Sequence, residues 1–270
     1  MRKLWVSISG GLTSAYMAIK LKQEYSDRYE LKFVYSNTGL EHEETLKFLD
    51  GVDRKFDLDI VWVEAVINPI KNKGTTHKVV SFDTCSRKGE PFEEMIKVYG
   101  VPNASYPHCN REMKIQVMND YVKSIGWKDE FRAIGIRMDE THRLADDAGK
   151  KRIIYPLVDF FPVEKEDIID WFDDKDYTLK IPNYLGNCVT CWKKSTPKLM
   201  RIMREDAKSF DFFDRMEKEH GLSGSNKDGT KRVFFRDHRS VKDLIAFEHA
   251  TPELDFESND RCANEECGLE

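Results

Sequence analysis

The feature that most constrains the fold is a short apolar segment that leads into a glycine-containing turn and then a helix. Residues 4–8 have the composition of a buried strand, the turn spans 9–14, and residues 13–23 have apolar side chains at helical spacing. The alternation continues, with strands predicted at 31–35, 60–67 and 131–136 and helices at 43–56 and 111–125. This order predicts an α/β fold: a doubly wound, mostly parallel sheet with helices on both faces.

The rest of the chain indicates a C-terminal helical segment and then a tail. An amphipathic helix is expected over 164–172, one or two more over 196–220, a polar loop over 222–231, and a last helix over 240–249 that Ser240 caps. Seven acids and one arginine lie between Thr251 and Glu270, with few large apolar residues to form a core. We therefore expect an α/β domain over 1–160, a helical segment over 161–250 packed on the sheet, and a flexible, mobile tail over 251–270.

The composition limits the classes of function. Of 270 residues, 40% are hydrophobic and 34% are charged, and the net charge of −5 gives no global signal for binding nucleic acid or an anionic membrane. The longest apolar runs have the length of strands, and no signal peptide precedes Ser7, so we expect a cytoplasmic protein without a membrane span. In that reducing compartment, the six cysteines favour metal binding or thiol chemistry over disulfides.

The turn after the first predicted strand has the composition of a phosphate-binding loop. Glycines let backbone N–H groups face an anion, and the start of the following helix adds positive potential. Hydroxyl groups can supply further hydrogen bonds to phosphate oxygens. The predicted phosphate-binding residues are Ser7, Ser9, Gly10, Gly11, Thr13 and Ser14. An ordinary glycine-containing turn between strand and helix is the alternative interpretation.

Two further polar segments follow predicted strands, at the edge where open α/β sheets bind ligands. The segment after the second strand is expected to contact adenine and ribose, and the one after residues 131–136 to clamp a phosphate or sulfate through arginine hydrogen bonds. The predicted residues are Ser36, Asn37, Thr38, Gly39, Lys114, Gly135, Arg137, Glu140 and Arg143. A capped connection and ordinary surface arginines are the alternatives.

Four cysteines are candidates for a metal centre. Cys188 and Cys191 form a C-x-x-C turn, which lets two thiolates face one ion or cluster, or act as a redox dithiol. With Cys109 and Cys85 they make four ligands, enough for tetrahedral zinc or a [4Fe–4S] cluster. His108 is a substitute ligand, and Cys85 is equally well explained as a small buried side chain.

Together these motifs resemble the adenylylsulfate and phosphoadenylylsulfate reductase family of the PP-loop, adenine nucleotide alpha-hydrolase superfamily, most of all its phage-type reductase-like members. Residues 9–14 resemble the family's pyrophosphate loop, and 37–39 with Glu44-Thr45 its adenosine-contacting segment. Residues 109–114 and 183–191 resemble its cluster-binding segments, and 266–269 the terminal motif that carries the nucleophile, Cys267. The chain differs at three positions: His108 replaces a cysteine, Thr13 an aspartate and Glu270 a histidine.

The resemblance implies a sulfonucleotide reductase with a [4Fe–4S] cluster. The Cys267 thiolate would attack the sulfur of adenylylsulfate or phosphoadenylylsulfate, and a thioredoxin- or glutaredoxin-like dithiol would release sulfite from the resulting S-sulfonate. An ATP-dependent adenylating or sulfur-transfer enzyme is the first alternative, and the only one under which a nucleic-acid partner is expected. A nucleotide-binding protein with a structural metal is the second. The sequence is compatible with a homo-oligomer and does not define one.

Overall fold

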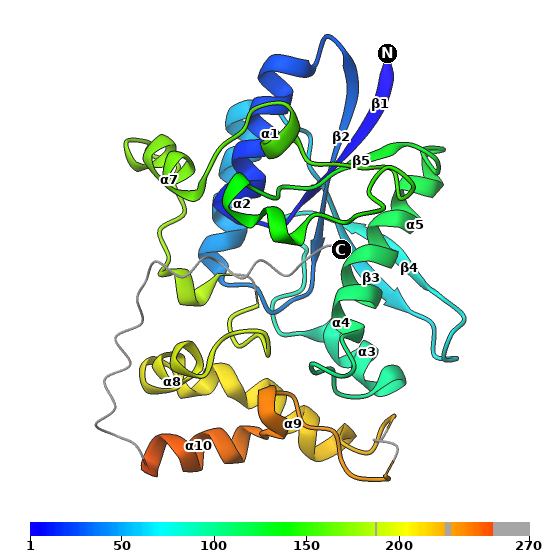
Figure 1. Ribbon diagram of the computed structural model, residues 1–270. Helices are drawn as coiled ribbons and strands as arrows, with labels where there is room; N and C mark the ends of the chain where they lie inside the picture. The colour runs from blue at the N-terminus through cyan, green and yellow to red at the C-terminus, as the bar shows by residue number, and fades with distance from the viewer. Residues whose placement is uncertain (187, 225–227, 251–270) are drawn as a thin grey trace.

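Six strands form one sheet in the order β4-β3-β2-β1-β5-β6 (Figure 1). The computed structural model describes residues 1–186, 188–224 and 228–250. All neighbouring strands are parallel except the edge pair of β3 and β4. The strands are β1 (Arg2–Ile8), β2 (Tyr29–Asn37), β3 (Val61–Ile67), β4 (Thr75–Val80), β5 (Phe131–Ala133) and β6 (Ile153–Ile154). The predicted doubly wound, mostly parallel α/β sheet is confirmed.

Helices cover both faces of the sheet, and three more lie at one end. The α-helices are α1 (Leu12–Tyr25), α2 (Glu43–Phe56), α3 (Glu90–Tyr99), α4 (His108–Asn110), α5 (Gln116–Ser124), α6 (Pro156–Asp159), α7 (Lys165–Asp173), α8 (Thr196–Glu205), α9 (Asp211–His220) and α10 (Val241–Ala250). One turn of π-helix, η1 (Arg111–Ile115), joins α4 to α5. Short 3₁₀ turns are η2 (Met138–Arg143), η3 (Asn183–Leu185), η4 (Ala207–Phe210) and η5 (Arg236–His238).

Alternating side chains of the strands build two cores, one on each face. Leu4, Val6 and Ile8 of β1 pack with apolar residues of α1, α2 and α7. Trp5 points to the other face, where α3 and α5 pack and where the core continues into α8, α9 and α10. This period of two is that of a strand buried on both faces. Each fully buried aliphatic side chain stabilises the fold by roughly 2 kcal/mol.

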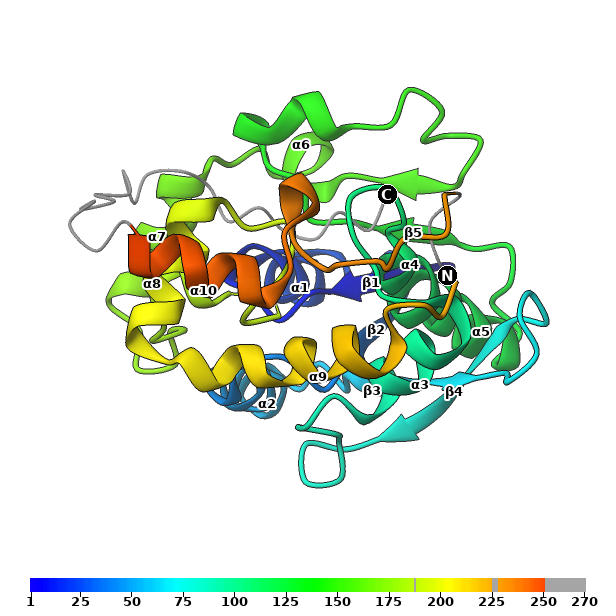
Figure 2. The ribbon, with the colours of Figure 1, turned by 90° about the horizontal axis from the view of Figure 1, so that it is seen from below.

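The layer of α8, α9 and α10 lies below the sheet in Figure 1 and faces the viewer in Figure 2. The Arg215 guanidinium on α9 is 2.7 Å from Glu93 on α3, which ties this layer to the sheet's helices. In Figure 1 the chain enters β1 at the top, so the helical layer lies toward the carboxyl ends of the parallel strands. That end of the sheet is where ligands bind in open α/β folds.

Most predicted elements are present. The one or two helices expected over 196–220 are the two helices α8 and α9, joined by η4, whereas the strand expected over 131–136 ends at Ala133, and α3 and β6 were not predicted. Strand β4 was not predicted, because its residues are mainly polar and exposed at the edge of the sheet. Ser240 does cap the last helix: its Oγ accepts a hydrogen bond from the Asp243 amide at 3.2 Å.

The domain boundaries at 160 and 250 remain predictions, as does the tail over 251–270, which lies outside the described residues together with Cys267. Within the described residues, no helix combines the length and the hydropathy required to cross a membrane.

Candidate functional site

The turn between β1 and α1 requires glycine at one position. Gly10 has a φ of +88°, and a Cβ there would come within 2.8 Å of the Thr45 methyl group and 3.6 Å of the Tyr35 ring. Hydrogen bonds hold the turn from inside: the Ser9 amide donates to Ser14 Oγ at 3.1 Å, and that hydroxyl donates to the Gly11 carbonyl at 3.0 Å. Helix α1 then begins without a capping side chain or an acid in its first turn. Its positive end is therefore available to an anion.

Buried polar atoms without partners lie beside this turn. Among the described residues, Tyr35 Oη, Thr45 Oγ1 and Asn37 Oδ1 are buried and have no hydrogen-bond partner. Burial raises the pKa of Tyr35 well above its usual value, and the nearby Glu41 and Cys188 add to the effect, so its hydroxyl remains a neutral donor. A buried polar group left unsatisfied costs about 1–3 kcal/mol. Such a set indicates a place for a ligand or ordered water.

Arg137 joins the segment after β5 to the glycine turn. It is 1% exposed and donates to Thr13 Oγ1 at 2.9 Å. Two bonds of 2.9 Å connect it to Asp139, and Glu140 lies 3.3 Å away. Arg143 also binds Glu140, at 2.5 Å. The predicted residues Arg137, Glu140 and Thr13 are thus brought together, but carboxylates balance both arginines, and the predicted clamp on phosphate or sulfate remains a prediction.

Gly135 lies at the same point of contact. A Cβ at Gly135 would meet Ser14 Cα and the Thr13 methyl group at 3.6 Å, which is ordinary van der Waals contact. The chain order reverses here, because β1 has β2 on one side and β5 on the other. Such a switch point opens a crevice at the carboxyl ends of the strands. The predicted phosphate loop and the predicted segment 135–143 therefore meet where the fold favours a ligand.

The end of β2 is held by two backbone carbonyls and one side chain from three other places in the chain. Ser36 Oγ donates to the Met113 carbonyl at 2.6 Å. Asn37 Nδ2 donates to Glu64 at 2.6 Å and to the Ser86 carbonyl at 2.9 Å. Sequence reasoning missed Glu64, which is fully buried in β3, and Tyr35, which reads as part of a strand core. A charged residue within an apolar strand was the available signal for Glu64.

Glu64 is an ionised carboxylate inside the protein. Burial opposes ionisation, but hydrogen bonds from Lys78, Ser86 and Asn37 outweigh it and lower the pKa of Glu64. The Lys78 ammonium lies 2.9 Å from the carboxylate. Thr38 has a similar local partner, since its hydroxyl donates to Glu41 at 2.7 Å, and the Gly39 carbonyl accepts from the Gly89 amide at 2.9 Å. These contacts fix the strand end rather than leaving it free.

The C-x-x-C turn docks directly on this strand end. Cys188 forms a β-bridge with Glu41, and the Val189 amide donates to the Leu40 carbonyl at 3.1 Å. Cys188 Sγ lies 3.4 Å from Thr38 Oγ1. Burial and Glu41 raise the pKa of Cys188, while the positive charge of Lys114 lowers it. Lys114 comes from the π-helical turn, a feature frequent at functional sites, so the predicted Lys114, Thr38 and Cys188 are gathered in one place.

The four predicted metal ligands are not gathered as a zinc site. Zn–S bonds of ~2.3 Å place tetrahedral thiolates roughly 4 Å apart. Among the described residues, no three of the cysteine sulfurs lie within 4.8 Å of one another. An iron–sulfur cluster is larger and spaces its thiolates further apart, so this distance does not test it. The cluster remains a prediction for Cys109, Cys188 and Cys191.

Cys85 differs from the other three in its surroundings. It is 5% exposed and packs in the α1 and α2 core, whereas Cys109 packs against the α3 and α5 core. Its thiol donates to the Phe82 carbonyl at 3.3 Å, and Arg87 donates to its sulfur at 3.3 Å. Burial raises the pKa of Cys85, with Arg87 opposing. This placement favours the small buried side chain over the fourth ligand.

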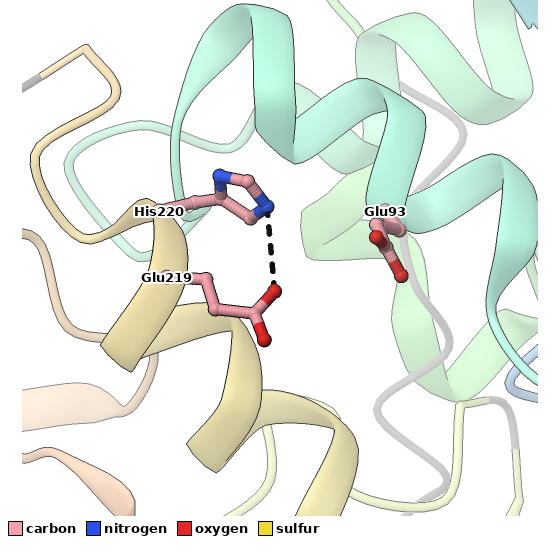
Figure 3. A group of neighbouring side chains, drawn as sticks. All are labelled: Glu93, Glu219 and His220. Carbon is pink, nitrogen blue, oxygen red and sulfur yellow. Dashed lines mark ion pairs between the residues drawn. The ribbon is translucent and has the colours of Figure 1, made fainter.

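The described residues contain one group of three ligand types within 4.8 Å: Glu93, Glu219 and His220 (Figure 3). Glu93 comes from α3 and the other two from the end of α9. Arg215 lies between the two glutamates, 2.7 Å from Glu93 and 3.5 Å from Glu219. A cation of the protein already neutralises this group, which therefore acts as an ion-pair junction between helices.

The topology and the strand-end site define a class: doubly wound α/β proteins with a glycine turn at the switch point. No family model matches the chain. It is 30% identical over 240 residues to the nin region protein ORF290 of Escherichia phage lambda, covering 87% of this chain and 81% of that protein. The chain belongs to the family of that phage protein, which confirms the expected likeness to phage proteins.

Two more distant similarities were found. Protein MJ0066 of Methanocaldococcus jannaschii is 26% identical over 152 residues, which cover 56% of this chain and 26% of that protein. Among solved structures, the U34-tRNA thiolase NcsA from Methanococcus maripaludis with its [4Fe-4S] cluster aligns with a TM-score of 0.43 and 15% identity, covering 99% of this chain and 78% of that one.

Proposed function

We propose that the chain is an enzyme that binds an adenine nucleotide with its phosphates on the 9–14 turn. The observation that carries the proposal is the Gly10 turn at the switch point, with the unsatisfied hydroxyls of Tyr35 and Thr45 beside it. Two hydroxyls and a helix start can satisfy phosphate or ribose oxygens. Asn37 Oδ1, also unsatisfied, is placed to accept from an amino group such as that of adenine.

The balance of charge favours magnesium ATP over phosphoadenylylsulfate. Carboxylates pair with Arg137 and Arg143, and Glu64 and Glu41 lie at the neighbouring strand end. Phosphoadenylylsulfate, with its extra 3′-phosphate, would need an excess of cations, whereas magnesium neutralises part of the charge of ATP. The favoured reaction is adenylation: a substrate oxygen attacks the α-phosphorus, and pyrophosphate leaves. A sulfide then attacks the carbon that bears this oxygen: a C–S bond forms, the C–O bond breaks, AMP leaves with the oxygen, and sulfur takes its place.

Sulfonucleotide reduction is the second candidate, supported by the terminal motif around Cys267. The thiolate would attack the sulfur of an adenylyl sulfate, forming an S–S bond while the S–O bond breaks and the nucleotide phosphate leaves. A thioredoxin-like dithiol would attack Cys267 Sγ, release sulfite and end as a disulfide. Reduction needs Cys267 as a nucleophile, whereas adenylation does not.

Product analysis separates the two reactions. Purified full-length protein is incubated anaerobically with magnesium ATP and sulfide, with and without an oxygen-bearing acceptor, or with adenylylsulfate or phosphoadenylylsulfate, thioredoxin and dithiothreitol. Adenylation predicts pyrophosphate that depends on an oxygen-bearing acceptor and persists in Cys267→Ser. Reduction predicts sulfite that this variant abolishes while nucleotide binding is retained. If neither nucleotide binds, the proposal fails at its first step.

The predicted iron–sulfur cluster is part of the same proposal. Cys188 and Cys191 would hold it on the turn docked at β2, with Cys109 from α4 as the third ligand, and it would bind or activate sulfur there. Anaerobic purification followed by iron and sulfide analysis tests this assignment. Cys188→Ser is expected to lose the cluster, and Cys85→Ser to retain it. Retention in Cys188→Ser would exclude the assignment.

A further inference from the structure

A cavity lies at the amino ends of β5 and β6, away from the glycine turn. It has a volume of about 460 Å³, and its lining comes from α5, β1, β5, β6 and the turns that precede β5 and β6. Strands β1, β5 and β6 are parallel, so their amino ends share one edge of the sheet. The Gly10 turn follows the carboxyl end of β1, at the opposite edge. This cavity is therefore separate from the site proposed above.

The lining carries an excess of positive charge. Its cations are Lys123, Lys128, Arg132, Lys151 and Arg152, and the one acid in it is Glu130. Asp147 lies just outside and pairs with Lys151 at 3.0 Å. Counting that pair as neutral, the cations still outnumber the acids, in a chain whose net charge is −5. Such a concentration of one sign raises the local concentration of anions.

One of these cations is built into the wall. The Arg132 side chain is 8% exposed, and its guanidinium lies over the Trp5 ring at 5.4 Å from the ring centre. The Arg132 amide donates to the Arg152 carbonyl at 2.8 Å, which fixes the backbone on both sides of the cavity. Contact with the ring keeps this guanidinium in the wall, where its positive charge attracts an oxyanion.

We propose that this cavity binds a phosphate-bearing small molecule that also carries hydroxyl groups, of the size of a sugar phosphate or a nucleoside phosphate. Three lysines and two arginines in the lining suit a dianionic phosphate better than a single carboxylate. Glu130 accepts and Asn119 both donates and accepts, so they suit hydroxyl groups rather than a second phosphate. The volume lies in the usual range for small-molecule sites.

Titration of the full-length, ¹⁵N-labelled protein with ribose 5-phosphate, and separately with AMP, tests the proposal. The signals to follow are the Arg132 Nε–H and the Asn119 side-chain amide, with Gly10 and Ser14 as reporters of the other site. We expect saturable shifts of Arg132 and Asn119 with at least one of the two probes. Whichever binds more tightly identifies a sugar phosphate or a nucleoside phosphate as the ligand.

Matched variants locate the binding. The double substitution Lys123→Gln and Lys128→Gln is expected to weaken binding about tenfold or more. The control, Lys47→Gln with Lys55→Gln on α2, removes two lysines that pair with Glu44 and Asp176 outside the cavity and should bind like the parent. Shifts confined to Gly10 and Ser14, equal affinity in all variants, or no saturation would overturn the proposal. The test substitutes lysines rather than the buried Arg132, so it does not depend on whether an Arg132 variant folds.

Discussion

The two ends of the sheet use arginine in opposite ways. At the carboxyl end, Arg137 is bonded to Asp139 and lies beside Glu140, and its remaining donor fixes Thr13. At the amino end, Arg132 lines a cavity in which cations outnumber acids. The first arrangement fixes the turn that we propose binds phosphate through backbone and hydroxyl groups, and the second is the one that we propose attracts an anion by its charge. The type of residue therefore does not define its role, because the charges around it do.

The largest effect is expected at the carboxyl end, from Gly10→Ala. The new Cβ would lie 2.8 Å from the Thr45 methyl group, and the alanine would have to keep a φ of +88°, which residues with a side chain rarely adopt. The turn must therefore change shape. We expect ATP affinity to fall by about 100-fold or more, equivalent to about 3 kcal/mol. Gly51→Ala on α2 is the matched control, since a Cβ there meets nothing within 4 Å. Calorimetric titration of both variants checks the prediction, and unchanged affinity in Gly10→Ala would remove the phosphate turn from the site.

Arg137→Met tests whether this arginine is mainly structural. The substitution leaves the partly exposed Asp139 without its cation, while the buried Glu140 keeps Arg143, and we expect a loss of about 2 kcal/mol in unfolding free energy. At the other end, Arg132→Met should destabilise less, because the guanidinium lost there lies in a cavity lining where cations outnumber acids. Urea denaturation of both variants gives the comparison. Equal losses would mean that the two arginines do not differ as proposed.

The sequence predicts the sheet well, because β1, β2 and β3 are apolar runs that alternate with periodic helices. It does not predict β4, whose polar residues are held by pairing with β3 and by side-chain partners distant in the sequence, such as the Asp120 carboxylate that accepts from the His77 amide. The contact of Arg137 with Thr13 joins residues 124 positions apart, and Asn37 meets Glu64 across two strands. Such pairings depend on three-dimensional packing, which motif spacing cannot supply. The glycine turn could be predicted because strand, loop and helix follow one another directly.

Glu217, a buried carboxyl group on α9 in the helical layer, can be compared with the two arginines through the pH dependence of stability. Burial raises the pKa of Glu217 from 4.5 to about 7, although the amides of Phe234 and Val241 donate to it and oppose this. The unfolded chain therefore ionises first, and stability falls as pH rises from about 4.5 to about 7. We expect the unfolding free energy of the parent, relative to Glu217→Gln, to fall by about 3 kcal/mol over that interval. If the difference in unfolding free energy between the parent and Glu217→Gln stays constant across this pH range, burial does not raise the pKa of Glu217.

The smallest effect separates ligand binding from stability most directly. Tyr35→Phe removes a buried hydroxyl that has no partner among the described residues, and the phenyl ring keeps its edge-on contact with Trp62 at 4.8 Å. Because no hydrogen bond is lost in the unliganded protein, we expect unfolding free energy to stay the same or rise by up to about 1 kcal/mol. If the hydroxyl serves the nucleotide, ATP affinity should nevertheless fall by about tenfold. Lower stability with unchanged affinity would mean that water or the fold, rather than a nucleotide, satisfies this hydroxyl. The carboxyl end would then lose its clearest distinction from the amino end, where charge rather than unsatisfied hydroxyls marks the site.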